Sequence, residues 1–197
     1  MSAGYKFNLK PIEKVMPEMC RFETVYRYSG GFNLVLDNLT GVEAIPPMTP
    51  LVLDFKTRKA TAVINVEVAE KYTSGTSMRI KKGSLAYAGM FIGDGTNGAK
   101  ISRIDKTAED YDTLTLEAAF GSSVTVEAGT VLYEATAVAG TEKKALAKAL
   151  NYAWTKVEQG ATVTAIGQAY EIRPSRLIAP ISESDKDSLG DRFMFTY

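Results

Sequence analysis

The chain contains no histidine and only one cysteine, Cys20, among its 197 residues. Without histidine, the protein cannot build a Ser-His-Asp or Cys-His catalytic group, and it cannot hold a metal through imidazole. A single cysteine excludes an intrachain disulfide and a cysteine-rich zinc site. We expect Cys20 to be a small buried or half-buried apolar residue, and we expect no metal and no cofactor.

The chain also lacks a net charge, because 23 Lys and Arg residues balance 23 Asp and Glu residues. No overall field therefore draws the protein to nucleic acid or to an anionic membrane. No apolar run approaches the length of a transmembrane helix, and residues 1–14 lack the apolar region of a signal peptide. We expect a protein made in a cytoplasm, with neither nucleic acid nor membrane as a partner.

What the chain does contain is enough apolar sequence for a core, in short runs with a β pattern. Alternating or β-branched segments are separated by turns rich in Gly, Asn, Asp and Ser, which predicts a mainly β protein built as a small barrel or sandwich. The expected strands cover residues 32–36, 51–53, 58–68, 83–92, 99–104, 111–120, 130–138, 161–172 and 191–197.

One amphipathic helix is predicted over residues 142–158, with Thr141 as its N-cap. Apolar residues recur at helical spacing on one face, whereas most lysines fall on the other. The lysines could form a nucleic-acid surface, but without clustered arginines a solvated face is the favoured interpretation. Trp154, beside the apolar stripe, is expected to be a core residue or a subunit-contact anchor.

A cluster of turn residues at 93–98, Gly-Asp-Gly-Thr-Asn-Gly, allows three interpretations. Calcium could use oxygens of Asp94 and Asn97, yet the ligand spacing of an EF-hand loop is missing. A phosphate site would need a following Gly-Lys-Ser/Thr and a helix, and neither is present. The favoured interpretation is a hairpin tip in which these residues adopt positive φ.

Residues 1–45 mix aromatic residues, methionines and charges without a sustained period, which is typical of an arm that becomes ordered on its own domain or on a partner. An extended arm can add a strand to the sheet edge of a partner. The segment 32–36 could equally pair inside its own domain, and both possibilities stay open. The candidate binding residues of the arm are Phe7, Phe22, Tyr26, Phe32, Leu34 and Leu36.

Residues 46–63 follow the arm and begin with three prolines, Pro46, Pro47 and Pro50. Prolines lack an N–H donor, so we expect a stiff extended segment that starts a strand at a sheet edge and not in mid-sheet. The segment resembles the head decoration proteins of lambda-type bacteriophages. The residues that carry this resemblance are Met48, Thr49, Pro50, Leu51, Leu53, Asp54, Arg58 and Lys59.

The resemblance implies a homotrimer on the outside of a phage capsid, in the virion, whose partners are the major capsid protein and its own copies. It also implies a β-tulip-like domain over residues 46–197, behind the arm, that stabilises the shell. This chain is longer than the family's pattern, so either the domain carries insertions such as the helix at 142–158, or a second module follows after about residue 121. The added length leaves room for the alternative, a head fibre or adhesin that binds host or mucosal glycans.

An enzyme is not expected. Catalysis requires titratable groups that converge on one place. The acidic residues here are scattered over turns and loops, and although two carboxylates could meet in space, no pair stands out in the sequence.

Overall fold

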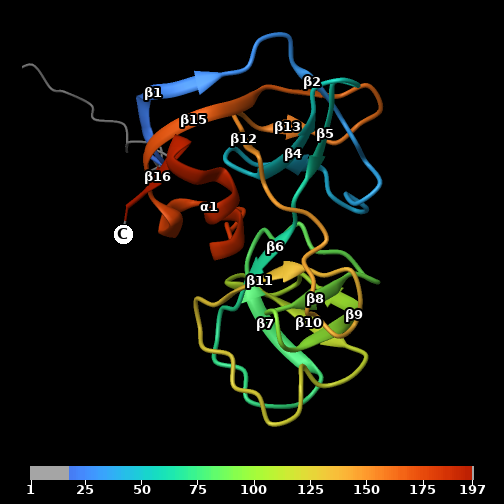
Figure 1. The fold of residues 1–197 in the computed structure, drawn as a ribbon. Helices are drawn as coiled ribbons and strands as arrows, with labels where there is room; N and C mark the ends of the chain where they lie inside the picture. The colour runs from blue at the N-terminus through green and yellow to red at the C-terminus, as the bar shows by residue number, and fades with distance from the viewer. Residues whose placement is uncertain (1–17, 197) are drawn as a thin grey trace, which may run out of the picture.

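The computed structural model describes residues 18–196, and within them the chain is mainly β, as predicted. Two curled sheets lie one above the other, and the chain runs from the upper sheet into the lower one and back (Figure 1). We call residues 18–63 and 141–196 the large lobe, and residues 64–140 the small lobe. The small lobe is thus inserted into the chain of the large one.

The large lobe is built on an eight-stranded sheet with the order β1-β15-β12-β4-β5-β2-β14, in which β16 pairs in parallel with β15. A separate pair, β3 with β13, lies beside it. The strands are β1 (Arg21–Arg27), β2 (Phe32–Leu34), β3 (Ala44–Ile45), β4 (Pro50–Asp54), β5 (Lys59–Ala62), β12 (Ala149–Asn151), β13 (Thr155–Lys156), β14 (Thr162–Val163), β15 (Ala165–Ile172) and β16 (Phe193–Phe195). The helical elements are η1 (Pro174–Arg176), α1 (Glu183–Leu189) and η2 (Gly190–Arg192).

The small lobe is a six-stranded sheet with the order β6-β11-β8-β9-β10-β7. An isolated bridge between Val68 and Ile80 connects its two outer strands, so the sheet closes on itself as a small barrel. Its strands are β6 (Asn65–Glu67), β7 (Ser77–Lys81), β8 (Phe91–Gly93), β9 (Gly98–Asp105), β10 (Tyr111–Leu116) and β11 (Val131–Glu134).

The hydrophobic core is continuous across the two lobes. One buried cluster joins Phe32 and Leu51 of the large lobe to Ile80 and Phe120 of the small lobe. A second cluster, which includes Leu150 and Leu189, lies under α1 on the large lobe. Because side chains of both lobes pack in one core, we expect the lobes to unfold together.

The predicted helix over residues 142–158 is wrong. This segment runs extended, with Lys144 N donating to Glu134 O at 2.9 Å and Lys148 N donating to Leu51 O at 2.8 Å. Its strand β12 fills the gap between β4 and β15 and buries Leu150 completely. Intrinsic helix propensity is weak, and here the burial gained in the sheet overrides it. Within the described residues the α-helix is α1, at Glu183–Leu189, outside the segment for which a helix was predicted.

The expectation that the proline-led strand lies at a sheet edge is also wrong. β4 lies in the middle of the large sheet, between β12 and β5. Pro50 is its first residue, a position at which a missing N–H costs little. The pairing around it uses other donors, since Met48 N binds Asn151 O at 2.7 Å and Asn151 N binds Thr49 O at 2.8 Å.

The part of the predicted arm that the structure describes belongs to the large sheet. β1 pairs with β15, and β2 pairs with both β5 and β14. Of the two possibilities left open for this segment, residues 32–34 therefore show pairing within their own domain. In addition, β10 and β11 lie on either side of residue 121 in one sheet, so that sheet continues through the predicted module boundary.

Other segments differ in detail from the predicted strands. Residues 83–90 form turns, and only the last part of the segment 83–92 enters a strand, β8. β1 was missed because its side chains do not alternate between buried and exposed, and β7 because its alternation, with Met78 and Ile80 buried, spans only five residues.

Candidate interaction surfaces

β1 forms one edge of the large sheet and is the most exposed strand of that sheet. Two of its aromatic side chains are more than half exposed, Phe22 at 51% and Tyr26 at 62%. The register with β15 shifts between Arg21 and Tyr26, and Thr24 Oγ1 accepts a hydrogen bond from Tyr170 N across this irregular stretch. Bulges and charged side chains are the usual protection of an open edge against indiscriminate pairing.

An aromatic patch continues from the end of β1 to the tip of the β4–β5 hairpin. We define the aromatic patch as Tyr26, Tyr28, Phe32 and Phe55, whose neighbouring rings meet edge to face. The Tyr28 and Phe55 ring centroids are 5.1 Å apart, and those of Phe32 and Phe55 are 5.4 Å apart. Phe55 is 54% exposed at the tip, whereas Phe32 forms the buried base of the patch. Edge-to-face contacts of this kind hold the rings in place and leave one side open.

Arg58 fixes the aromatic patch to the backbone of the β1–β2 turn. Its Nη2 donates to Ser29 O at 2.5 Å and to Gly31 O at 2.8 Å, and its guanidinium lies 4.1 Å from the Phe32 ring centroid. Asp54 closes the hairpin tip by accepting hydrogen bonds from the hydroxyl and backbone N–H of Thr57, which lower the pKa of this carboxyl.

The six predicted arm residues separate into three groups. Phe22 and Tyr26 are exposed and remain candidates for contact with a partner. Phe32 and Leu34 are buried and Leu36 is partly buried in the core, so these three serve the fold of their own domain. Phe7 lies outside the described residues. Phe55 was not predicted as a candidate contact residue, although an aromatic residue in a tight polar turn is a signal of exposure.

The residues that carry the resemblance form the β4–β5 hairpin and the segment before it. The buried members are core residues, so their pattern reflects packing in the middle of the sheet. Asp54 and Lys59 are exposed at the hairpin, and Leu53 and Arg58 are half-buried. The buried members are Met48, Thr49, Pro50 and Leu51.

A second exposed surface surrounds Trp154, where a cavity of about 440 Å³ opens between the two lobes. Trp154 is 52% exposed, so it is not a core residue, and its role as a subunit contact stays a prediction. Both lobes contribute polar lining: Glu43 comes from the large lobe, and in the small lobe Lys82 Nζ is 3.0 Å from Asp112 Oδ1. A pocket of this size suits a small polar ligand with one apolar side.

The turn at 93–98 is a hairpin tip between β8 and β9, as favoured, but of its residues only Gly95 adopts a positive φ. Asp94 Oδ1 accepts hydrogen bonds from Thr96 N at 2.8 Å and Asn97 N at 2.7 Å. Gly140 crosses directly over this hairpin, and a Cβ on it would lie 2.1 Å from Asn97 O. Close backbone contact, together with a φ of +69° at Gly140, explains the need for glycine.

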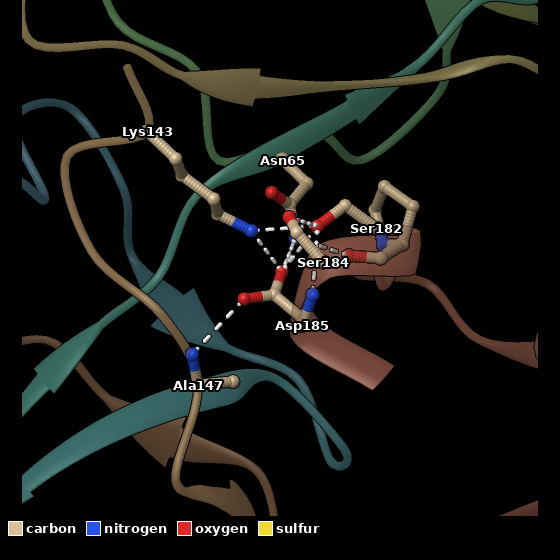
Figure 2. Close-up of polar contacts among 7 residues, drawn as sticks. Asn65, Lys143, Ala147, Ser182, Ser184 and Asp185 are labelled. Atoms are coloured by element: carbon tan, nitrogen blue, oxygen red, sulfur yellow. Dashed lines mark hydrogen bonds and ion pairs between the residues drawn. The ribbon is translucent and has the colours of Figure 1, made fainter. Parts of the chain in front are cut away.

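A buried polar network lies where the chain enters and leaves the small lobe. Asp185 on α1 forms an ion pair with Lys143, and its side chain also accepts hydrogen bonds from Asn65 Nδ2 at 2.8 Å and Ala147 N at 3.0 Å (Figure 2). Burial lowers the pKa of the Lys143 ammonium, an effect that Asp185 partly opposes. The expectation that this lysine lies on a solvated face is therefore wrong, because the helix on which it rested does not form.

The described residues also bear on two other classes of site. Residues 18–196 contain no helix that is both long and apolar enough to span a membrane. In the same residues, the side chains of Cys, Asp and Glu form no group of three that could hold a metal ion.

Comparison with known proteins gives one family. A family model described as head fiber protein, from phages, matches residues 6–193. Neither the curated proteins nor the solved structures include a significant match. The match corresponds to the head fibre that the sequence left as an alternative, and decoration-protein character is not part of it. Because it covers nearly the whole chain, this chain belongs to the phage head fibre proteins, which are structural, non-enzymatic proteins of the virion on the outside of the head.

Proposed function

We propose that the large lobe attaches the protein to the coat of the phage head, and that the open edge of β1 together with the aromatic patch makes the contact. The observation that carries this proposal is the exposure of Phe22 and Tyr26, both more than half exposed on an edge strand. Large aromatic side chains that lose water at an interface supply much of its binding energy.

The backbone of β1 offers a second source of affinity. Its outer side has no neighbour in the described sheet, so N–H and C=O groups there can pair with a strand of the coat protein. The charges on β1, from Arg21, Glu23 and Arg27, favour a partner strand of complementary charge and oppose pairing with other edges.

The attached form in this proposal is a homotrimer that stabilises the shell. The proposal of a trimer is based on the resemblance of residues 46–63 to decoration proteins. A protein that binds the assembled shell better than free coat subunits stabilises the shell by mass action. Three linked copies convert a weak single contact into firm attachment, because the second and third contacts form at high effective concentration.

Co-sedimentation with purified phage heads tests the attachment. We expect Phe22→Ala with Tyr26→Ala to weaken binding about 30-fold or more, since each truncated anchor costs roughly 1–2 kcal/mol. Val138→Ala, which truncates an exposed apolar residue on the small lobe, is the matched control and should bind like the wild type. Unchanged binding of the double variant would refute the proposed contact.

Light scattering tests the trimer separately. A trimeric mass for the free or head-bound protein supports it, and a monomer that binds heads with full affinity contradicts it. The attachment and the oligomeric state can therefore fail independently.

A second candidate function is glycan binding at the cavity beside Trp154. An exposed indole ring offers a flat apolar surface to a sugar ring, and Lys82, Ser84 and Glu43 surround it with polar groups. Binding to a glycan array that Trp154→Ala removes, without a change in head binding, would establish this function. A wild-type protein that binds no glycan on the array would exclude it.

A further inference from the structure

The network between the two lobes contains the parts of a covalent cross-link. Asn65 is the first residue of β6, where the chain enters the small lobe, and Lys143 lies where the chain has just left it. Both side chains point at Asp185 of α1 (Figure 2). Asn65 is 3% exposed, Asp185 is fully buried, and the Lys143 side chain is 7% exposed, so bulk water is excluded from all three.

We propose that Lys143 and Asn65 form an intramolecular amide bond, made by the folded protein itself. One carboxylate oxygen, Asp185 Oδ2, accepts a hydrogen bond from Asn65 Nδ2 at 2.8 Å and forms the ion pair with Lys143 Nζ. The amine that would attack and the amide nitrogen that would leave are thus held on the same atom. Holding two reacting groups in this way replaces an encounter between them by a step within one folded molecule.

The surroundings fix each of the three groups. Asn65 Nδ2 also donates to Pro180 O at 3.0 Å, which orients the amide, while its Oδ1 has no hydrogen-bond partner in the part of the chain that the structure describes. Ser182 Oγ donates to Asp185 Oδ2 at 2.8 Å and lies 2.6 Å from Lys143 Nζ. Ala147 N holds the other carboxylate oxygen. The carboxylate therefore stays between the two nitrogens.

Lys143 is suited to act as the nucleophile because burial lowers the pKa of its ammonium group. A neutral amine carries the lone pair that attacks a carbonyl carbon, and desolvated lysines act as nucleophiles for this reason. Asp185 can accept the ammonium proton directly, since the two groups already form an ion pair.

The reaction balances without a further reagent. A proton passes from Lys143 to Asp185, and Nζ attacks Asn65 Cγ, so that the Nζ–Cγ bond forms and the Cγ–Nδ2 bond breaks. A second proton from Nζ goes to the departing nitrogen, which leaves as ammonia, and Asp185 remains protonated. No atom is oxidised or reduced. The product replaces a buried ion pair by neutral groups, which removes the cost of burying two charges.

The bond would close the small lobe at its base. It joins the strand that enters this lobe to the segment that leaves it, so a pulling force along the chain would pass from residue 65 to residue 143 without unfolding the strands between them. This property does not depend on which surface attaches the protein to the head.

Intact-mass spectrometry of the purified full chain is the direct test. We expect the wild type to be lighter than its sequence by the mass of one ammonia molecule, and a digest to contain one branched peptide with both Asn65 and Lys143. A wild type at its full sequence mass overturns the proposal, whether or not any variant folds. A loss of one water molecule instead would overturn Asn65 as the acceptor, because it would mean condensation with Asp185.

Single-residue variants identify the two side chains that form the bond. Asn65→Ala and Lys143→Arg should each restore the full sequence mass, since arginine keeps the charge but does not form this bond. Lys144→Arg is the matched control, because this neighbouring lysine pairs with Glu134 at 2.6 Å outside the network, and it should keep the mass deficit. A deficit that persists in Lys143→Arg would refute the assignment.

Discussion

The two lobes differ in how the chain builds them. The small lobe comes from one continuous segment, and its β8–β9 and β9–β10 pairs join strands that follow each other in sequence. In the large lobe, β12 lies between β4 and β15, so its sheet interleaves strands from two segments separated by the whole small lobe. Local pairing makes the small lobe a closed unit, whereas the large lobe depends on contacts over long distances in sequence.

The lobes also differ in how many large apolar side chains and open strand edges they expose. Nearly all exposed large apolar side chains of the described residues belong to the large lobe, and Val138 is the exception on the small lobe. Closure through the bridge between Val68 and Ile80 leaves the small barrel without an open edge at that seam, whereas β1 leaves one on the large sheet. This difference supports the proposal that the large lobe makes the contacts with the head and presents the small lobe. The large-lobe residues concerned are Phe22, Tyr26, Phe55, Leu146, Trp154 and Met194.

The largest expected effects come from cavities in the shared core. Phe32→Ala in the large lobe and Phe120→Ala in the small lobe should each lower the free energy of unfolding by about 3–5 kcal/mol. Because both side chains belong to one cluster, we expect a single transition by far-UV circular dichroism and by fluorescence of Trp154, the one tryptophan of the chain. If Phe120→Ala left the Trp154 transition in place, the lobes would be independent and the comparison would need to be revised.

Substitutions in the buried polar network between the lobes should lower the free energy of unfolding almost as much. Asp185→Ala leaves Lys143 buried without its acidic partner, which should cost about 3–5 kcal/mol of unfolding free energy in urea titrations. Asp187→Ala changes an exposed residue of the same helix and should stay within about 0.5 kcal/mol of the wild type. Equal stabilities of the two variants would show that the junction does not hold the lobes together.

An intermediate effect is expected inside the small lobe at Gly140. A Cβ there would meet Asn97 O, so Gly140→Ala should cost roughly 2–4 kcal/mol from the contact and the positive φ together. Gly129→Ala provides the control, because its φ is also positive but nothing lies near its added Cβ. This variant should cost only about 1 kcal/mol, and the difference in midpoint of thermal unfolding measures the packing of the loop over the hairpin.

The smallest effect concerns Cys20, which is 2% exposed beside β1. Burial, and then the charge of Glu18, raises the pKa of this thiol to about 11. The thiolate is the reactive form, so we expect slow labelling by iodoacetamide at neutral pH and faster labelling in denaturant. Rapid labelling of the folded protein would show that the start of the large lobe opens readily.

Sequence patterns predicted the small lobe better than the large one, for a physical reason. Leu114 and Leu116 alternate with polar residues along β10, and this period of two is visible without knowing the partner strand. In contrast, the residues around Leu150 carry a helical spacing, and only the gap between β4 and β15 makes them a strand. A pattern within one segment cannot show a gap that distant segments create.

The candidate surfaces were predictable only in part for the same reason. Phe22 and Phe32 look alike in sequence, yet one is exposed on an edge and the other is buried under Phe55. The burial of Lys143 could not be foreseen, because its acidic partner lies 42 positions away on a short helix. Composition alone was enough for one conclusion, because a chain without histidine cannot form a histidine-based catalytic group.

The central claim is that the large lobe attaches to the head and presents the small lobe outward. Electron cryomicroscopy of phage heads with bound protein, at a resolution that separates the two lobes, tests it most directly. The account predicts density for β1 and the aromatic patch against the coat protein, with the six-stranded barrel pointing away from the shell. A structure in which the small lobe rests on the coat, and β1 faces solvent, would contradict it.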